Sequence, residues 1–372
     1  MTRAVERLAA AAGILARWTD QEGAEQVTPP ETRAALLAAM GLPSEEAESA
    51  EALAAREAEE AARILPQETV AVAGEAVSVP LGAPSAWRLR LEEGGAIEGP
   101  RSDAAVFTPP PGVHALEAGG QAGLVVAAPL RAPSVEDLSG RARVWGATAP
   151  LYGLRSARNL GLGDFEDLAQ AAEALGPLGA DFLGINPIHD RGMAHAGWSP
   201  YSPSSRIALA QGHIAVERAP GFAGSAEARR LLAEAAPGVE AAREGDLARY
   251  DSRAAAAAPA LRALFEDVRA APSDRADRRA FAEWAAGPGA ALRGVALFEA
   301  LSLRFGDDFR LWPAAYRDPR GAEVARFARE AAEEVEYHLW LQWIADEQLN
   351  DAQRRACASG MAFGLYLDLA VG

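Results

Sequence analysis

The residues best suited to bind a substrate lie in one short stretch, residues 198–206, which reads WSPYSPSSR. A proline stands on each side of Tyr201 within two residues. Proline locks φ and removes a hydrogen-bond donor, so few backbone conformations remain. A tyrosine ring held in one place can stack on the flat apolar face of a sugar, while nearby hydroxyls meet its polar rim. An aromatic plug that packs over the end of a sheet is an equally good interpretation of Tyr201.

The elements that position this stretch are predicted strands of a parallel sheet. Residues 143–154, 181–190 and 361–372 read as strands, and residues 163–179 between the first two predict a helix. A strand–helix–strand crossover commits its two strands to being parallel. In parallel α/β folds the chemistry gathers at the carboxyl ends of the strands. The candidate substrate-binding residues at or after these ends are Asn186, His189, Ser199, Pro200, Tyr201 and Asp368.

The carboxylates and imidazoles near these strand ends do not by themselves define a catalytic site. Asp190 and Asp368 stand at strand ends, but two acids in a sequence make a catalytic pair only if the geometry joins them. His189 and His195 could donate to sugar hydroxyls, but they lack a third metal ligand at a recognisable spacing and are interpreted as loop residues. We therefore assign no catalytic residue, and we expect no metal and no cofactor.

Two further regions precede the predicted parallel sheet. Residues 1–65 predict a helical N-terminal unit, in which Thr28 is placed to cap a helix. Residues 67–130 contain short runs in which side chains alternate with period two, and Gly and Pro separate these runs. The pattern predicts a small antiparallel β-sandwich with Trp87 in its core. Residues 134–372 form the third region, with a helical insertion at about 215–330.

Composition excludes several classes of partner. The 372 residues are 49% hydrophobic and 24% charged, which is ordinary for a folded globular chain. The net charge is −16 and no basic stripe is present, so a nucleic-acid partner is not expected. No apolar run approaches the ~20 residues that span a bilayer, and we expect a cytoplasmic protein without a membrane partner. The single cysteine, Cys357, is interpreted as a buried thiol.

Five blocks of sequence stand in a distinctive order: LYGLRSARNLGLGDFEDL, GINPIHD, SPYSPSSR, YHLWLQW and GLYLDLAVG. Together they resemble the motif series of the 4-α-glucanotransferases known as amylomaltases or disproportionating enzymes. The likeness extends to the helix near Thr28 and points to the longer bacterial type with extra N-terminal domains. It implies an α/β fold in which a (β/α)8 TIM barrel follows the helical unit and the sandwich.

The resemblance also implies a reaction. Enzymes of this family cut an α-1,4-glucan or maltooligosaccharide, keep the donor piece as a covalent glycosyl-enzyme, and pass it to another sugar hydroxyl. In this family Tyr201 would stack on the sugar ring next to the cleavage point. Such retaining chemistry uses two carboxyl groups about 5 Å apart.

The family's Asp nucleophile and Glu acid/base lie after the block DLAVG, and this sequence ends at Gly372. A barrel needs eight strands, and three are predicted here. We therefore expect the first part of an incomplete barrel, inactive by itself. A truncated protein that binds glucan or a partner without catalysis is a second hypothesis. A hydrolase of the α-amylase type is a third, which product analysis would separate because transfer makes longer chains.

Overall fold

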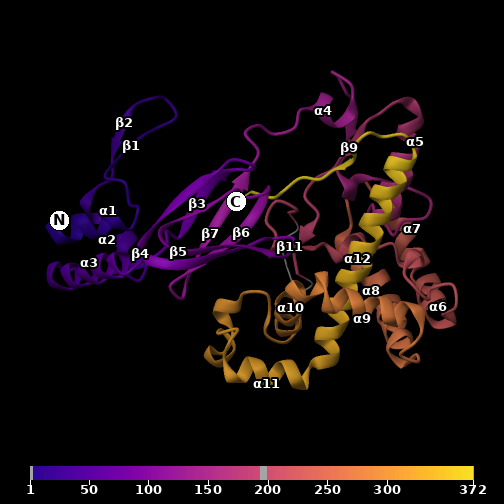
Figure 1. Cartoon of the computed structure of the whole chain (residues 1–372). Helices are drawn as coiled ribbons and strands as arrows, with labels where there is room; N and C mark the ends of the chain where they lie inside the picture. Colours follow the sequence, from indigo (N-terminus) through magenta and orange to yellow (C-terminus); the bar gives the residue numbers. More distant parts are fainter. Residues whose placement is uncertain (1–2, 193–198, 372) are drawn as a thin grey trace. The chain divides into compact units, whose positions relative to one another are not determined.

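The computed structural model describes residues 3–192 and 199–371. The chain divides into two compact units, Met1–Ala132 and Pro133–Gly372, and Figure 1 labels their helices and strands. The first unit contains three helices and a short hairpin, followed by a five-stranded sheet. The second unit contains a three-stranded parallel sheet, a second short hairpin and most of the helices.

The N-terminal helices are α1 (Arg3–Ala11), α2 (Pro30–Ala39) and α3 (Glu46–Ala61). They enclose a small core of Val5, Leu8, Ala9, Leu37 and Leu53. The strands β1 (Arg17–Thr19) and β2 (Glu25–Val27) form a hairpin that the helical interpretation missed. The predicted cap at Thr28 was wrong, because Pro29 is the N-cap residue of α2 and no side chain caps it. The Thr28 N–H instead donates to the Ala16 carbonyl and closes the hairpin.

The following sheet corrects the predicted antiparallel sandwich. Its strands are β3 (Glu68–Val72), β4 (Val77–Arg90), β5 (Ala96–Phe107), β6 (Gly112–Ala118) and β7 (Gln121–Ala128). They form one continuous sheet in the order β3-β7-β6-β4-β5, in which β3 and β7 are parallel and the other pairs are antiparallel. The strands were predicted correctly as alternating runs, but strand order and direction are properties of the pairing and not of the alternation.

The core of this sheet contains Trp87, as predicted, with 7% of its surface exposed. Trp87 pairs with Gly99 on β5, and Phe107 lies eight residues farther along that strand. Eight residues of straight strand span about 26 Å, yet the two rings are 5.6 Å apart. The two strands therefore bend between these positions, where the register of β4 shifts between Pro80 and Ser85 and between Ser85 and Trp87. The bend brings Trp87 and Phe107 into one core.

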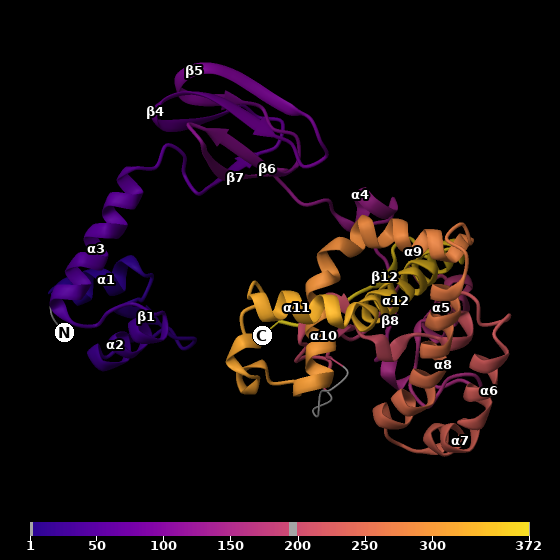
Figure 2. The same cartoon turned by 90° about the horizontal axis from the view of Figure 1, so that it is seen from below.

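The parallel sheet of the second unit confirms the predicted strand–helix–strand arrangement. The strands β8 (Gly146–Thr148), β9 (Phe182–Gly184) and β12 (Gly364–Tyr366) pair in the order β12-β9-β8, all parallel. The helix α5 (Phe165–Leu175) connects β8 to β9, and α12 (Ala332–Ala358) precedes β12. Both helices lie together beside the sheet (Figure 2), and Arg355 of α12 pairs with Glu166 and Glu173 of α5 at 2.7 and 2.8 Å.

Helices fill the predicted insertion. They are α6 (Ala226–Glu234), α7 (Ala236–Glu244), α8 (Tyr250–Ala270), α9 (Ala276–Ala286), α10 (Arg293–Phe305) and α11 (Ala322–Glu330), with α4 (Val135–Ser139) before the sheet. Single turns of 3-10 helix are η1 (Leu151–Gly153), η2 (Gly176–Leu178), η3 (Gln211–His213), η4 (Val216–Arg218), η5 (Pro288–Leu292), η6 (Phe309–Leu311) and η7 (Ala314–Tyr316). A hairpin of β10 (His189–Asp190) and β11 (Ser205–Leu209) precedes η3 and the helices of the insertion.

The long helix α12 supplies much of the core of this unit. Leu339, Trp343 and Ile344 are 2%, 3% and 0% exposed, which confirms that these residues pack in the core. Cys357 in its last turn was predicted to be buried, and this was wrong: the thiol is exposed and lies 3.4 Å from the Gln353 amide nitrogen. Within the described part of the chain no helix is long and apolar enough to cross a membrane.

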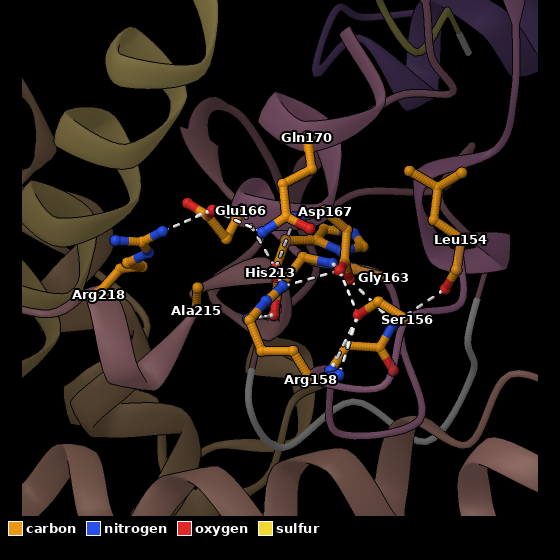
Figure 3. A network of polar contacts seen from close by, with 12 residues as sticks. Leu154, Ser156, Arg158, Gly163, Glu166, Asp167, Gln170, His213, Ala215 and Arg218 are labelled. Carbon is orange, nitrogen blue, oxygen red and sulfur yellow. Dashed lines mark hydrogen bonds and ion pairs between the residues drawn. The ribbon is translucent and has the colours of Figure 1, made fainter. Parts of the chain in front are cut away.

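A polar network fixes the loop that follows β8 (Figure 3). The Arg158 guanidinium pairs with Asp164, Asp167 and Glu217. Asp164 is the N-cap of α5 and accepts the backbone N–H groups of residues 166 and 167. The His213 Nδ1 lies 2.8 Å from the Gly163 carbonyl oxygen, so η3 is attached to the same loop. The network joins the first crossover helix to the segment after the hairpin.

His213 provides a test of this packing through pH. Burial lowers the pKa of its imidazole from 6.5 to about 4, and the Gly163 carbonyl offsets this only in part. The folded chain therefore binds fewer protons than the unfolded chain between these pH values. The contribution of His213 to stability is complete above the unfolded pKa and is lost as pH falls toward the folded pKa, by up to about 3 kcal/mol.

We expect the difference in free energy of unfolding between the wild type and His213→Gln to shrink as the pH falls from about 7 to about 4. Urea unfolding of both proteins at several pH values measures it. Comparing the two proteins cancels the other titrating groups. A difference that does not change with pH would show that the imidazole is not held neutral by burial.

Candidate functional site

A groove of about 560 Å³ lies at the carboxyl ends of the three parallel strands. The register places Thr148, Gly184 and Tyr366 level with one another at this end of the sheet. The chain that follows each strand forms the groove walls. The lining residues are Thr148, Ala149, Pro150, Tyr152, Gly184, Ile185, Asn186, Tyr201, Tyr366, Leu367 and Asp368.

Three of the predicted substrate-binding residues meet in this groove: Asn186, Tyr201 and Asp368. The sequence analysis missed Tyr152 and Tyr366, which line it too. A signal was available, because both follow or end a predicted strand in the same way as Asp368 does. With Tyr201 they place three tyrosines around one groove.

Tyr201 is presented to solvent by a tight turn. Its backbone N–H donates to the Ser199 hydroxyl at 3.3 Å, and the Ser202 N–H donates to the Ser199 carbonyl at 3.1 Å. The side chain of Tyr201 is 57% exposed. This exposure favours an accessible ring over a buried plug. Tyr366 is 64% exposed and packs edge-on against Phe182, with ring centroids 5.8 Å apart.

Asn186 lines the groove, but its amide is already engaged. The oxygen Oδ1 accepts the Leu151 N–H at 2.7 Å, and Nδ2 donates to the Pro187 carbonyl at 2.7 Å. Asn186 is buried, and Leu151 is fully buried beside it. This side chain therefore ties the loop after β8 to the end of β9, and it holds Tyr152, the next residue after Leu151, at the groove wall.

The other predicted residues lie outside the groove. His189 and Pro200 line a separate cavity of about 100 Å³, which shares no lining residue with the groove. Ser199 lines neither and instead accepts the Tyr201 N–H. Burial lowers the pKa of His189, and Arg206 lowers it further while Asp368 raises it. His195 lies outside the described residues.

The carboxylates do not form a pair across the groove. Asp190 is 3% exposed and lines the separate cavity, whereas Asp368 is exposed in the groove. Asp368 is the one carboxylate among the described residues that line the groove. Within the same described ranges no group of three His, Cys, Asp or Glu side chains is arranged to hold a metal ion. The groove can therefore stack on rings and accept hydrogen bonds from hydroxyls.

The Asn186 contact yields a stability prediction. We expect Asn186→Ala to lower the free energy of unfolding by about 1–3 kcal/mol, because the buried Leu151 N–H loses its acceptor. Urea unfolding measures the change. Asn350→Ala is the matched control, since this asparagine is exposed on α12 and bonds only at the surface. The control should change the same quantity by less than about 0.5 kcal/mol. Equal losses in the two variants would contradict a positioning role for Asn186.

Comparison with known proteins identifies the family of the chain that forms this groove. Residues 149–372 match the family model described as 4-alpha-glucanotransferase. The 4-alpha-glucanotransferase of Mycobacterium tuberculosis is 33% identical over 396 residues, covering 97% of this chain and 54% of the relative. That of Haemophilus influenzae is 33% identical over 243 residues, covering 62% of this chain and 35% of the relative.

A solved structure agrees with the sequence relatives. The crystal structure of amylomaltase from Corynebacterium glutamicum superposes with a TM-score of 0.79 at 26% identity, covering all of this chain and 55% of that one. The chain thus spans about half the length of the first relatives it matches. The matched region contains every groove residue from Ala149 to Asp368. The chain belongs to the 4-alpha-glucanotransferase family.

Proposed function

We propose that the groove binds an α-1,4-glucan as part of a 4-α-glucanotransferase that moves glucan segments between maltodextrins by a retaining mechanism. The observation that carries the proposal is the gathering of Tyr152, Tyr201, Tyr366 and Asp368 at the carboxyl ends of three parallel strands. This is the edge at which sites form in parallel α/β folds. The family to which the chain belongs supplies the reaction.

The groove has the chemistry that a glucan chain requires. Each glucose unit has apolar ring faces and a rim of hydroxyls. Tyrosine rings offer flat apolar area with a polar tip, so the exposed Tyr201 and Tyr366 suit the faces. The Asp368 carboxylate has two acceptor oxygens and suits a pair of hydroxyls on the rim. The proposed roles are stacking for the tyrosines and hydrogen bonding for Asp368.

The proposed contribution of this chain is binding and not bond cleavage. Retaining transfer uses a nucleophile and an acid/base about 5 Å apart. Asp368 is the single carboxylate among the described groove residues, and Asp190 faces the separate cavity. A second carboxyl would therefore have to come from outside the described residues of the groove. We propose that the 372-residue chain by itself binds maltodextrins without transferring them.

We further propose that the parallel sheet is part of a (β/α)8 barrel. The strands β8, β9 and β12 lie in chain order in the sheet, with helices in each connection. This is the arrangement of successive barrel strands. The segment after the edge strand β12 carries exposed apolar residues, with Leu369 61% and Val371 88% exposed. Exposed apolar side chains beside an edge strand are suited to cover by further elements.

Stacking gives the first test of the proposal. We expect Tyr201→Ala to weaken the binding of maltoheptaose to the full chain by about tenfold, because a lost aromatic contact costs about 1–1.5 kcal/mol. Tyr366→Ala should weaken it in the same direction. Isothermal titration calorimetry measures both. The control is Phe309→Ala, an exposed aromatic residue of η6 that does not line the groove, and it should bind as the wild type does.

Product analysis tests the reaction separately. Incubation of the chain with maltotriose should leave the sugar unchanged. Longer chains would show that a complete transferase site lies within this chain, and shorter products alone would indicate a hydrolase. If the wild type does not bind maltoheptaose, the groove is not a glucan site, and a role in binding a protein partner becomes the better hypothesis.

A further inference from the structure

Asp190 lies at the base of the segment that carries Tyr201. Its main chain pairs with Ser205 of β11. Its carbonyl oxygen accepts two hydrogen bonds from Ser204, one from the backbone N–H at 3.0 Å and one from the hydroxyl at 3.2 Å. The segment therefore leaves and rejoins the hairpin at one point. We call residues 190–192 and 204–205 the neck.

The side chain of Asp190 fixes the outgoing arm of the neck. Its Oδ1 accepts the N–H of Arg191 at 2.9 Å and that of Gly192 at 3.3 Å. Gly192 has φ of +75°, in the left-handed region that favours glycine. A Cβ at this position would lie 3.2 Å from a carboxyl oxygen of Glu299. The carboxyl holds the outgoing arm directly. The Arg191 N–H that it accepts belongs to the same peptide unit as the Asp190 carbonyl, so the carboxyl also orients the carbonyl that holds the returning arm.

A short, restrained stretch of backbone connects the returning arm of the neck to Tyr201. Only Ser202 and Pro203 separate Tyr201 from Ser204. Pro203 has a fixed φ, and the Ser202 N–H is bonded to the Ser199 carbonyl at 3.1 Å. Little backbone rotation therefore remains between the neck and Tyr201.

Asp190 itself does not face the groove. Its side chain is 3% exposed and lines the separate cavity. The groups that face it are the Gln211 amide of η3, His338 of α12 and the adjacent Arg191. Burial raises the pKa of its carboxyl to about 6. Oδ2 of Asp190 is buried and forms no hydrogen bond with any of the described residues. The hydrogen bonds of the side chain are therefore made through Oδ1, which accepts two backbone N–H groups.

We propose that Asp190 is a positioning residue for glucan binding: it holds both arms of the neck so that the Tyr201 ring meets the sugar. The inference rests on the proposed function of the groove. Asp190 touches no substrate and transfers no proton. Tyr201 contacts the sugar directly, whereas Asp190 acts only by positioning the Tyr201 ring.

The test compares Asp190→Ala, Asp190→Asn, Tyr201→Ala and the Asp190→Ala/Tyr201→Ala double variant of the full chain, with maltoheptaose as the ligand in calorimetry. We expect Asp190→Ala to weaken binding by about fivefold or more. Asp190→Asn keeps the Oδ1 acceptor and should stay within about twofold of the wild type. The double variant should bind no more weakly than Tyr201→Ala, because the positioned ring is already absent.

Wild-type affinity in Asp190→Ala, or independent losses that add in the double variant, would overturn the proposal. Equal losses in the Asn and Ala variants would overturn it too, because then the charge and not the acceptor would matter. If Asp190→Ala does not fold, Ser204→Ala replaces it: this variant removes one bond to the Asp190 carbonyl and leaves the buried carboxyl intact. It should weaken binding to a smaller extent, and unchanged binding would contradict the proposal.

A measurement without sugar separates this proposal from the proposed function. Amide hydrogen exchange of the segment 199–205 should be faster in Asp190→Ala than in the wild type and unchanged in Asp190→Asn. If the wild type does not bind maltoheptaose but the exchange follows this pattern, the neck is correct and the glucan site is wrong. If exchange is the same in all three proteins, Asp190 does not hold the neck.

Discussion

The level register of three short parallel strands is the constraint on which the rest of the site depends. Each of β8, β9 and β12 has only three residues, and their last residues, Thr148, Gly184 and Tyr366, lie side by side. Because parallel pairing sends all three carboxyl ends to the same edge, three loops distant in sequence converge there. A one-residue slip in any strand would turn its final side chain to the other face.

Side-chain contacts over long sequence distances fix the segments around these short strands. Gln342 of α12 bonds to both the N–H and the carbonyl of Leu209 in β11, at 2.8 and 2.9 Å. Arg206 of the same strand donates to the Ala370 carbonyl at 2.7 Å. Asn186 joins the first two loops in the same manner. The polar groups of this half of the molecule thus act as spacers between loops, while α12 supplies the apolar core.

The hairpin of β10 and β11 divides the polar residues of the second loop between two environments. Tyr201 is open to the groove, while Asp190 and His189 line a cavity with no residue in common with it. Groups in the groove meet water and are suited to meet a sugar. Groups in the cavity are desolvated, which raises the pKa of Asp190 and lowers that of His189. In the proposed function the two sets have different roles: the groove residues bind the glucan, and Asp190 holds a binding residue in place.

The amino-acid sequence alone determined the elements of the second unit and the rigidity of the Tyr201 turn. Apolar periodicity and proline act on neighbouring residues, so strands at β8, β9 and β12, the long helix α12 and the buried Trp343 follow from local pattern. The order of motifs was sufficient to indicate the family, which the family model confirmed. Tyr152 and Tyr366 could have been added by applying the strand-end argument to every polar side chain.

The tertiary structure decided which side each loop residue faces and which amides are free. His189 and Pro200 were predicted to bind substrate together with Tyr201, and they line another cavity. Asn186 lines the groove, and its Oδ1 accepts the Leu151 N–H. The tertiary structure likewise decided that β3 and β7 pair in parallel. These outcomes depend on partners that are distant in sequence, as in the Leu209–Gln342 contact between residues 133 positions apart. Local sequence sets the conformation of a segment, but the direction of its side chains is set by what packs against it.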